Sequence, residues 1–313
     1  MKFVIRSLAA VSLLAAAIAN AQVVKIIVPA PAGGGTDGFF RIVGKEAEPF
    51  LKTGVIIENV GGAGGTIGVA RMVAAAPDGM TLAGIWSSPL TATPHTLKAS
   101  YTPTDYIAVI ELSNSPYVMC VSPAFPAKDG PGLVAELKKN PGKYTYGNDG
   151  IGGTGQLAAQ RIFRALKVEV RDVPFKGAGE TLTSFLGGHV DIYMGSISPV
   201  MPQMKNGKAR CLVVTSAART ASIPEASGLK DLGIAGEETL LWRAILAPKA
   251  TPPEVVKKIE AAFEQAMGAP VVKKYCEEAG EQILIRKGGE LRRMLDSEYA
   301  ALGVVAKSLN LVQ

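Results

Sequence analysis

The feature that constrains the fold most is an internal repeat. A strand-like run, a Gly-Gly-Thr loop, a helical stretch, a second strand-like run and a Gly-Ala-Gly-x-Thr turn occur in the same order at residues 25–66 and 144–181. Each copy has the order of an α/β unit, and two such units that face each other make a cleft. Loops at the ends of the strands line such clefts. The repeat therefore predicts two similar lobes with a binding site between them.

The N-terminus has the pattern of a secretory signal peptide. Lys2 and Arg6 precede an apolar stretch at residues 8–18, which ends in the small-residue pattern of residues 19–21. This stretch is shorter than the roughly 20 apolar residues that span a bilayer. We expect residues 1–21 to be removed on export and the mature chain not to insert in the membrane. An uncleaved membrane anchor is the alternative.

Charge and cysteine content narrow the class of protein. The chain has 33 Lys and Arg against 27 Asp and Glu, with 6% aromatic residues and no block of like charges, so a nucleic-acid groove is not expected. Cys120, Cys211 and Cys276 form no Cys-x-x-Cys pair, and the first two lie in apolar, strand-like runs. Buried thiols are the favoured interpretation. One disulfide at most could form, and the sequence does not say which.

Short apolar runs alternate with amphipathic stretches as far as residue 215, which is typical of βαβ units and of a mainly parallel sheet. After Pro248 the pattern becomes helical, with helices expected at residues 254–268, 270–280 and 290–311. The predicted strands are residues 25–29, 55–58, 80–86, 106–112, 117–122, 143–146, 168–174, 191–194, 210–216 and 240–247.

Extended segments mark where the chain crosses between lobes. Residues 114–116 give the first crossing and residues 240–247 the return. This predicts a discontinuous first lobe, residues 22–114 plus 236–313, with residues 115–235 inserted as the second lobe, and a hinge that closes on a ligand. Two consecutive domains divided near residue 125 are the alternative, which explains the terminal helices less well.

The two glycine loops carry the predicted binding chemistry. Each follows a strand and opens a helix, so free backbone N–H groups lie at a helix N-terminus, where the partial positive charge favours carboxylate or phosphate. Glycine allows a ligand to approach the backbone closely. Thr36 and Thr154 could add hydroxyl donors. Tight turns without a ligand are the alternative for a single loop, but two matching loops favour binding.

Rival chemistries have weaker support. Gly150, Gly152 and Gly155 match the dinucleotide fingerprint, and Asp172 lies near the spacing of its ribose-binding acid, but the first copy lacks this pattern. His95 and His189 have no partner at metal-ligand spacing. The match of residues 227–230 to Ser-x-x-Lys lacks its supporting motifs. We therefore expect no enzyme activity, no cofactor and no metal.

Four side chains near the strand ends have two interpretations each. Asp37 either caps the helix after the first loop or points into the cleft, and capping is slightly favoured. Ser87 and Ser88 follow one predicted strand, and Ser196 follows another on the second lobe. They are candidates for ligand selection and are also ordinary loop residues.

At these residues the chain resembles the periplasmic substrate-binding proteins of tripartite tricarboxylate transporters, often called the Bug family. The likeness covers essentially the whole mature chain, and the order and spacing of its motifs are specific. These motifs are VPAPAGGGTD (28–37), ENVGGAGGTIG (58–68), PDGMTL (77–82), PGKYTYG (141–147), VPFKGAGETLTSFLGGHVD (173–191), GKARCLVVTSAAR (207–219) and LAPKATPPEVV (246–256).

The resemblance implies a type II, Venus-flytrap binding protein in the periplasm, which delivers a small carboxylate to a membrane permease. In the family, the loops matching residues 29–37 and 148–156 hold the ligand carboxylate through backbone amides and ordered water. The candidate ligand-binding residues are Ala30, Ala32, Gly33, Gly34, Gly35, Thr36, Asp37, Ser87, Ser88, Asn148, Asp149, Gly150, Ile151, Gly152, Thr154, Lys176, Gly177 and Ser196.

This chain departs from the family pattern in both loops. Ala30 replaces an aromatic residue and could leave room for a bulkier substrate. Asn148, Asp149 and Gln156 stand where the family often has small hydroxyl residues and a later His. An Asp149 that faces the cleft would repel a carboxylate, unless the substrate also has an amino group.

We therefore expect a non-enzymatic, monomeric binding protein for a small organic acid, an aromatic acid or an amino acid. Its partners would be the permease subunits of a tripartite transporter. A periplasmic sensor subunit that presents its ligand to a receptor kinase is the alternative, and a permease gene beside this one would favour transport.

Overall fold

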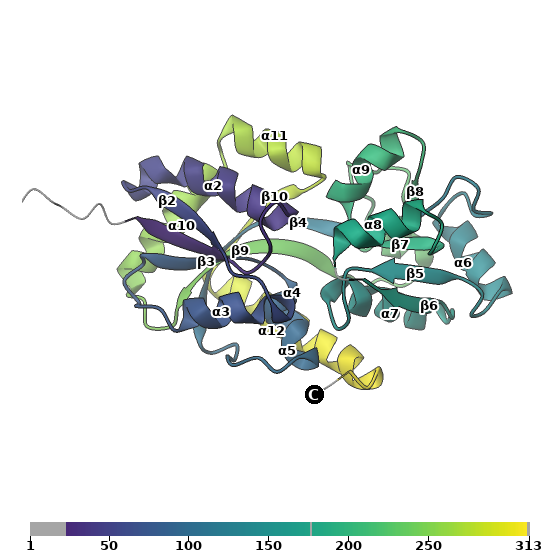
Figure 1. The fold of residues 1–313 in the computed structure, drawn as a ribbon, viewed down its shortest axis with the longest axis horizontal. Coiled ribbons are helices and arrows are strands. Elements are labelled where there is room, and N and C mark those ends of the chain that lie inside the picture. Colours follow the sequence, from purple (N-terminus) through teal and green to yellow (C-terminus); the bar gives the residue numbers. More distant parts are fainter. Residues whose placement is uncertain (1–22, 176, 312–313) are drawn as a thin grey trace, which may run out of the picture.

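The computed structural model describes residues 23–175 and 177–311. Figure 1 shows two lobes side by side, joined by long strands. The predicted signal peptide and Lys176 lie outside the described residues. Within those residues, no helix combines the length and the apolar character needed to cross a membrane.

Lobe 1 begins with a parallel βαβ unit. Strand β1 (Val24–Val28) pairs in parallel with β2 (Val55–Asn59) and with β3 (Thr81–Trp86). Apolar side chains of β1 are buried against α2 (Gly35–Leu51), so this helix covers one face of the sheet. The remaining elements of this lobe are η1 (Ala63–Gly65), α3 (Thr66–Val73), α4 (Ser88–Thr91), α5 (Thr93–Thr96), α10 (Pro253–Ala266), α11 (Pro270–Ala279), β10 (Gln282–Lys287) and α12 (Gly288–Ser308).

Lobe 2 repeats the same unit. Strand β5 (Thr145–Asn148) pairs in parallel with β6 (Arg171–Pro174) and with β7 (Ile192–Ser196), and α7 (Thr154–Leu166) packs its apolar face into the core. Both lobes therefore place a glycine loop at the carboxyl end of a parallel strand. The other elements are α6 (Gly130–Lys139), α8 (Ala178–Leu186), α9 (Ile197–Lys205), β8 (Arg210–Val214) and η2 (Leu229–Leu232).

Strands β4 (Tyr106–Val121) and β9 (Leu240–Pro248) join the lobes. Residues 106–116 of β4 pair antiparallel with β9, and residues 117–121 pair antiparallel with β7. The predicted division into strands 106–112 and 117–122 is wrong, because β4 continues through Pro116. This proline ends the ladder with β9, where its missing N–H interrupts no interior pairing. The lobe boundaries at residues 114/115 and 235/236 stay a prediction.

The sequence pattern also missed strand β10, which pairs antiparallel with β4. The side chains of β10 are exposed or half-buried, so no alternation of buried residues marked it as a strand. Helix α12 follows and reaches both lobes. Its first half lies against β4, and Leu302, Val305 and Ala306 near its end pack with Leu157 of α7.

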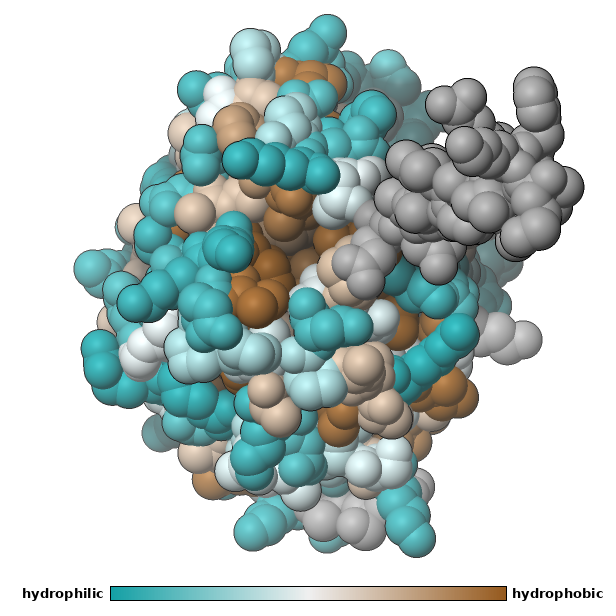
Figure 2. Space-filling model, turned by 90° about the vertical axis from the view of Figure 1, so that its left-hand side faces the viewer, coloured by the Kyte–Doolittle hydropathy of each residue, from teal (hydrophilic) through white to brown (hydrophobic). Residues whose placement is uncertain are grey.

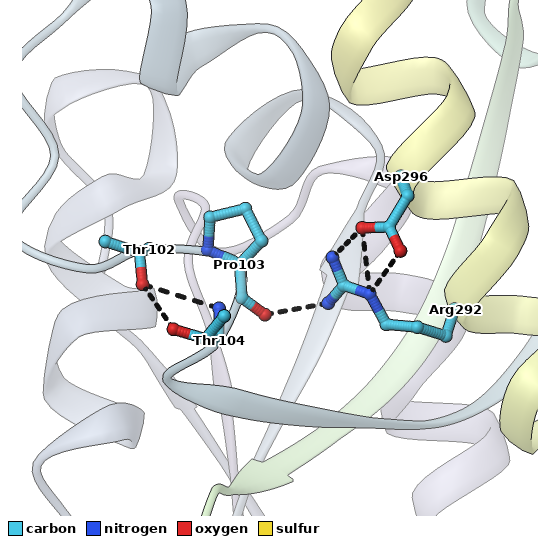
Figure 3. Close-up of polar contacts among 5 residues, drawn as sticks. All are labelled: Thr102, Pro103, Thr104, Arg292 and Asp296. Carbon is cyan, nitrogen blue, oxygen red and sulfur yellow. Dashed lines mark hydrogen bonds and ion pairs between the residues drawn. The ribbon is translucent and has the colours of Figure 1, made fainter.

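The start of α12 is fixed to the loop that precedes β4 (Figure 3). Arg292 Nη1 donates a hydrogen bond of 2.7 Å to the Pro103 carbonyl, and its Nε donates to both carboxylate oxygens of Asp296 at 3.0 Å. In the same loop, the hydroxyls of Thr102 and Thr104 form a hydrogen bond of 2.9 Å. These contacts hold α12 on lobe 1 while its far end touches lobe 2.

Cys120 and Cys211 form a disulfide between β4 and β8. The favoured prediction of buried thiols is wrong for this pair, because the two residues lie directly opposite each other in the ladder, a register that the sequence does not show. Cys276 in α11 remains a buried free thiol.

The outer end of lobe 1 has an apolar feature of its own. Figure 2 shows hydrophobic residues in a hollow surrounded by hydrophilic ones. Strand β2 lies at the edge of the sheet and leaves Ile56 47% exposed. This face lies away from the junction of the lobes, so it is separate from the candidate site.

Candidate ligand-binding site

The first glycine loop precedes α2, and no side chain caps the N-terminus of this helix. Gly34 is the N-cap residue and has no side-chain cap, while Gly33 has φ = +82°. A Cβ on Gly33 would meet no atom within 4 Å, and one on Gly34 would meet only the Pro31 carbonyl oxygen, at 3.6 Å. The first N–H groups of a helix lack intrahelical partners. This loop therefore leaves open space beside the N-terminus of α2, which suits an anion.

Asp37 holds this loop in shape. Its Oδ2 accepts from the Gly33 N–H at 2.8 Å and from Arg41 Nε at 3.0 Å, while its Oδ1 accepts from Asn59 Nδ2 at 2.9 Å. Burial alone raises the pKa of Asp37, but these hydrogen bonds and the Arg41 charge outweigh it and leave the pKa below its usual value. Asp37 thus accepts a backbone N–H just ahead of the helix, close to the capping role that the sequence favours.

The second glycine loop repeats this backbone. Gly153 is the N-cap residue of α7 and Gly152 has φ = +71°. The Gly152 N–H donates to Oε1 of Gln156, four residues on, at 2.6 Å, as the Gly33 N–H does to Asp37.

The first loop is held by an acid on the helix and an amide on the next strand, whereas the second loop is held by an amide on the helix and an acid on the next strand. Gln156 Nε2 donates to Asp172 on β6, and Asn148 Nδ2 donates to the other oxygen of Asp172 at 2.5 Å. Burial raises the pKa of Asp172 despite these bonds. Because amides of the loop hold both its oxygens, the arrangement gives no support to the ribose-binding role in the dinucleotide alternative.

Helices α4 and α5 of lobe 1 contact the second loop directly. Ser88 Oγ accepts from the Thr154 N–H at 3.2 Å, and Thr96 Oγ1 donates to the Gly152 carbonyl at 3.1 Å. A Cβ on Gly152 would lie 2.2 Å from Thr96 Oγ1. Thr93 Oγ1 donates to the Gly64 carbonyl at 3.4 Å, so the later turn of the first repeat also reaches this point.

Two buried hydroxyls at this junction have unused hydrogen-bonding capacity. Ser87 Oγ of lobe 1 and Thr154 Oγ1 of lobe 2 have no hydrogen-bond partner among the described residues. Both lie beside Tyr117, in contacts that fall short of hydrogen-bond geometry. Buried polar groups in native proteins are nearly always paired. The junction therefore has the capacity to bind a polar ligand or ordered water.

The remaining candidates differ in what they offer. Asp149 is half-buried beside Gly155, while Ile151 is 66% exposed. Ser196 opens α9, and its carbonyl accepts from the Tyr193 hydroxyl at 3.1 Å. Gly177 precedes α8 and borders open space.

The other members of the predicted set follow the two loops. The Ala30 carbonyl accepts from Asn59 Nδ2 at 3.1 Å, and Ala32 is exposed. Gly35 and Thr36 form the first turn of α2, and the Gly150 N–H donates to Asn148 Oδ1 at 3.0 Å. The structure thus gathers most of the predicted residues at the carboxyl ends of β1, β3 and β5.

Sequence reasoning missed Arg243 on β9. This arginine forms a buried ion pair with Glu281, stacks on Phe39 with its Cζ 5.2 Å from the ring centre, and brings Nη2 to 3.4 Å from where a Cβ of Gly35 would lie. Its Nε is buried without a partner among the described residues. An arginine inside the apolar run LLWRAILAP was the signal that could have identified it.

A separate groove also lies between the lobes. It has a volume of about 530 Å³ and is lined by Thr220 and Ser222 of lobe 2 and by Cys276 and Gly280 of lobe 1. The glycine loops do not line it. We place the candidate site at the loops because, among the residues that the structure describes, unpaired buried hydroxyls and helix N-termini occur together there.

Comparison with known proteins agrees with this architecture. Residues 39–311 match the model of the tripartite tricarboxylate transporter family receptor. A Cupriavidus necator protein described as the UPF0065 protein in the gbd 5′ region is 34% identical over 79% of this chain and 75% of its own length.

Two solved structures share the whole fold. A periplasmic transporter superposes with a TM-score of 0.82 at 32% identity, covering 93% of this chain and 98% of its own. MatC from Rhodopseudomonas palustris, with bound malate, superposes with a TM-score of 0.77 at 27% identity, covering 90% of this chain and 98% of its own. The predicted two-lobed α/β fold is confirmed, and the chain belongs to the family of tripartite tricarboxylate transporter receptors.

Proposed function

We propose that the protein is a periplasmic solute-binding protein that captures a small carboxylate between its lobes and delivers it to the permease of a tripartite transporter. Membership of the receptor family supports this role, as does the similarity to a protein that holds malate. The predicted signal peptide at residues 1–21 supports export.

The observation that carries the proposal is the pair of matched glycine loops. Each opens a helix, has no side-chain cap at the N-cap residue, and lies on its own lobe at the end of a parallel strand. The N-terminus of a helix carries about half a positive charge, so two of them offset the cost of removing a carboxylate from water. A ligand that contacts both loops favours the closed arrangement over an open one.

Thermal unfolding of the mature protein, with monocarboxylates, dicarboxylates, aromatic acids and amino acids as probes, tests this function. A ligand at 100 times its dissociation constant should stabilise the protein by about 2.7 kcal/mol. The proposal fails if several dozen acids give no shift in Tm. For an acid that does bind, deletion of the gene should abolish its uptake by cells.

A variant of the first loop locates the binding site. Gly34 has φ = −78°, so Gly34→Val adds a side chain to the open space without backbone strain and should abolish the shift while preserving the fold. Gly289→Val, at the start of α12, is the matched control and should keep the shift. Equal binding by both variants would move the site away from this loop.

A further inference from the structure

Arg243 of β9 lies where the first glycine loop leads into α2. It pairs with Trp86 in the antiparallel register of β9 and β3, so it stands at the carboxyl end of β3. Its Nη2 lies 3.4 Å from the position that a Cβ on Gly35, the first residue of α2, would take. Outside the loop and the helix, the described residues bring no other atom within 4 Å of that position. The guanidinium therefore borders the open space beside the N-terminus of α2.

The guanidinium is fixed in this position by its neighbours. Its Cζ lies 5.2 Å from the ring centre of Phe39 in α2, and its Nη1 forms an ion pair with Glu281. Glu281 also accepts a hydrogen bond of 2.9 Å from the Ser113 hydroxyl. Arg243 and Glu281 are only 4% and 8% exposed. A side chain that is already ordered loses little conformational entropy when a ligand binds to it.

The ion pair leaves one edge of the guanidinium available. A guanidinium has five N–H donors in one plane, and Nε and Nη2 donate in parallel from the same edge. Glu281 contacts Nη1, in an ion pair that does not meet hydrogen-bond geometry, whereas Nε is buried with no hydrogen-bond partner in the described chain. Buried donors in native proteins are nearly always paired. The edge formed by Nε and Nη2 therefore has the capacity to bind a partner from outside the chain.

The charges around this space favour an anion. The N-terminus of α2 has no side-chain cap at Gly34 and carries about half a positive charge. Arg243 adds a cation at the same end of the helix, where a cation is unfavourable unless an anion lies between the two. The acid of the loop, Asp37, is already paired with Arg41. A ligand anion in this space would contact both the helix N-terminus and the guanidinium.

We propose that Arg243 is a ligand-binding residue, which donates from Nε and Nη2 to the ligand carboxylate beside the first turn of α2. This inference rests on the proposed function and specifies the side chain of lobe 1 that recognises the carboxylate. The two parallel N–H bonds of an arginine match the two oxygens of a carboxylate. Glu281 holds the guanidinium in place, and its negative charge weakens the attraction of the site for an anion.

Isothermal titration of variants of the Arg243–Glu281 pair tests the proposal, with malate, adipate, benzoate and glutamate as probes. Arg243→Gln should weaken each acid that binds at least 10-fold, which corresponds to about 1.4 kcal/mol. Glu281→Gln removes the competing negative charge and should bind the same acids more tightly. Because either substitution breaks the ion pair, a purely structural role of the pair predicts similar weakening by both. That result would overturn the assignment.

Arg286→Gln is the matched control. Arg286 of β10 pairs with Glu111, which is 1% exposed, so this variant also leaves a buried acid without its cation. It should lower the free energy of unfolding and leave the affinity for each acid unchanged. Weakening by Arg286→Gln as large as that by Arg243→Gln would mean that loss of stability, and not loss of a ligand contact, explains both.

A double variant covers the case in which Arg243→Gln does not fold. Arg243→Gln combined with Glu281→Gln leaves no unpaired buried charge, which is the main cost of breaking such a pair. It should bind each acid at least 10-fold more weakly than Glu281→Gln alone. Equal affinity of these two proteins would refute the role of Arg243.

Failure of this inference is distinguishable from failure of the proposed function. Binding of a probe acid with the same affinity by the wild type and Arg243→Gln refutes the arginine contact and leaves a carboxylate-binding protein. Absence of binding by every acid refutes both.

Discussion

The two glycine loops have the same backbone and opposite side-chain chemistry. In lobe 1 an acid, Asp37, accepts the loop N–H and an amide on the next strand, Asn59, supports it. In lobe 2 an amide, Gln156, accepts the loop N–H, and an acid on the next strand, Asp172, supports it. The backbone bonds that fix a loop thus tolerate exchange of acid and amide.

The difference lies in what each loop leaves for a ligand. Arg41 neutralises the acid of the first loop, so that loop offers backbone amides and no net charge. In the second loop no cation among the described residues pairs with the acid: the partners of Asp172 are the side-chain amides of Asn148 and Gln156. The two loops therefore differ in charge although their backbones match.

The largest expected effect concerns the disulfide, which crosslinks lobe 2 only. Replacing Cys120 and Cys211 with Ala should lower the free energy of unfolding by about 3 kcal/mol, because the bridge closes a long loop in the unfolded chain. Urea unfolding with and without a reducing agent measures this. Cys276→Ala is the control in lobe 1 and should respond to reductant as the wild type does. Equal stability of the oxidised wild type and the double variant would contradict the prediction.

The next largest expected effect is the difference in stability between alanine variants at Gly152 and at Gly33, two glycines with a left-handed φ. Gly33→Ala should cost about 1 kcal/mol of stability, from backbone strain alone, because its Cβ meets no atom within 4 Å. Gly152→Ala adds a clash with Thr96 and should cost about 3 kcal/mol in total. Chemical denaturation of the two variants gives both numbers.

A second substitution sharpens this comparison. Thr96→Gly removes the Oγ1, Cβ and Cγ2 atoms that the new Cβ of Gly152→Ala would meet, so the double variant should regain part of the stability that Gly152→Ala costs. Thr96→Gly with Gly33→Ala should show simple additivity. Additive costs in both combinations would mean that the contact between lobe 1 and the second loop is absent in solution.

The smallest effect is an opposite pH dependence of the two loop acids. The pKa of Asp37 is lowered on folding, so its stabilisation is present above the unfolded pKa and is lost as pH falls through the folded pKa. The pKa of Asp172 is raised, so its contribution is present at low pH and is lost as pH rises through the folded pKa.

Unfolding free energies between pH 3 and pH 7 test these signs. Asp37→Asn should reduce the loss of stability on acidification, and Asp172→Asn should reduce the loss as pH rises above the usual range of an aspartate. Glu225→Gln provides the baseline for an exposed acid. Slopes of the same sign for both loop variants would contradict the pairing described for the loops.

The sequence predicted the two-lobed fold because the repeat carries it, whereas the place of the site stays a prediction. Strand-like runs that end in glycine are local features, and they identified β1, β5 and the loops that follow them. Pro116 led to a wrong prediction of two strands, because the sequence does not show that this proline lies where β4 changes partners. Strand β10 escaped detection because its side chains do not alternate in burial.

The polar pairs of the site could not be predicted in the same way. Asn59, which supports Asp37, and the partners of Asp172 and Arg243 lie far along the chain and become neighbours only through sheet register and helix packing. The opposition of Cys120 and Cys211 depends on register as well. Pairing of this kind is a property of the assembled fold, whereas a glycine loop is a property of a few consecutive residues.

A crystal structure of the mature protein with the best-stabilising probe acid tests the central claim most directly. The account predicts a ligand carboxylate within about 3 Å of the backbone N–H groups of the loop at residues 33–37, with the second loop at residues 150–154 contacting the same molecule. A ligand in the groove between residues 220–222 and α11, or one that touches neither glycine loop, would contradict it.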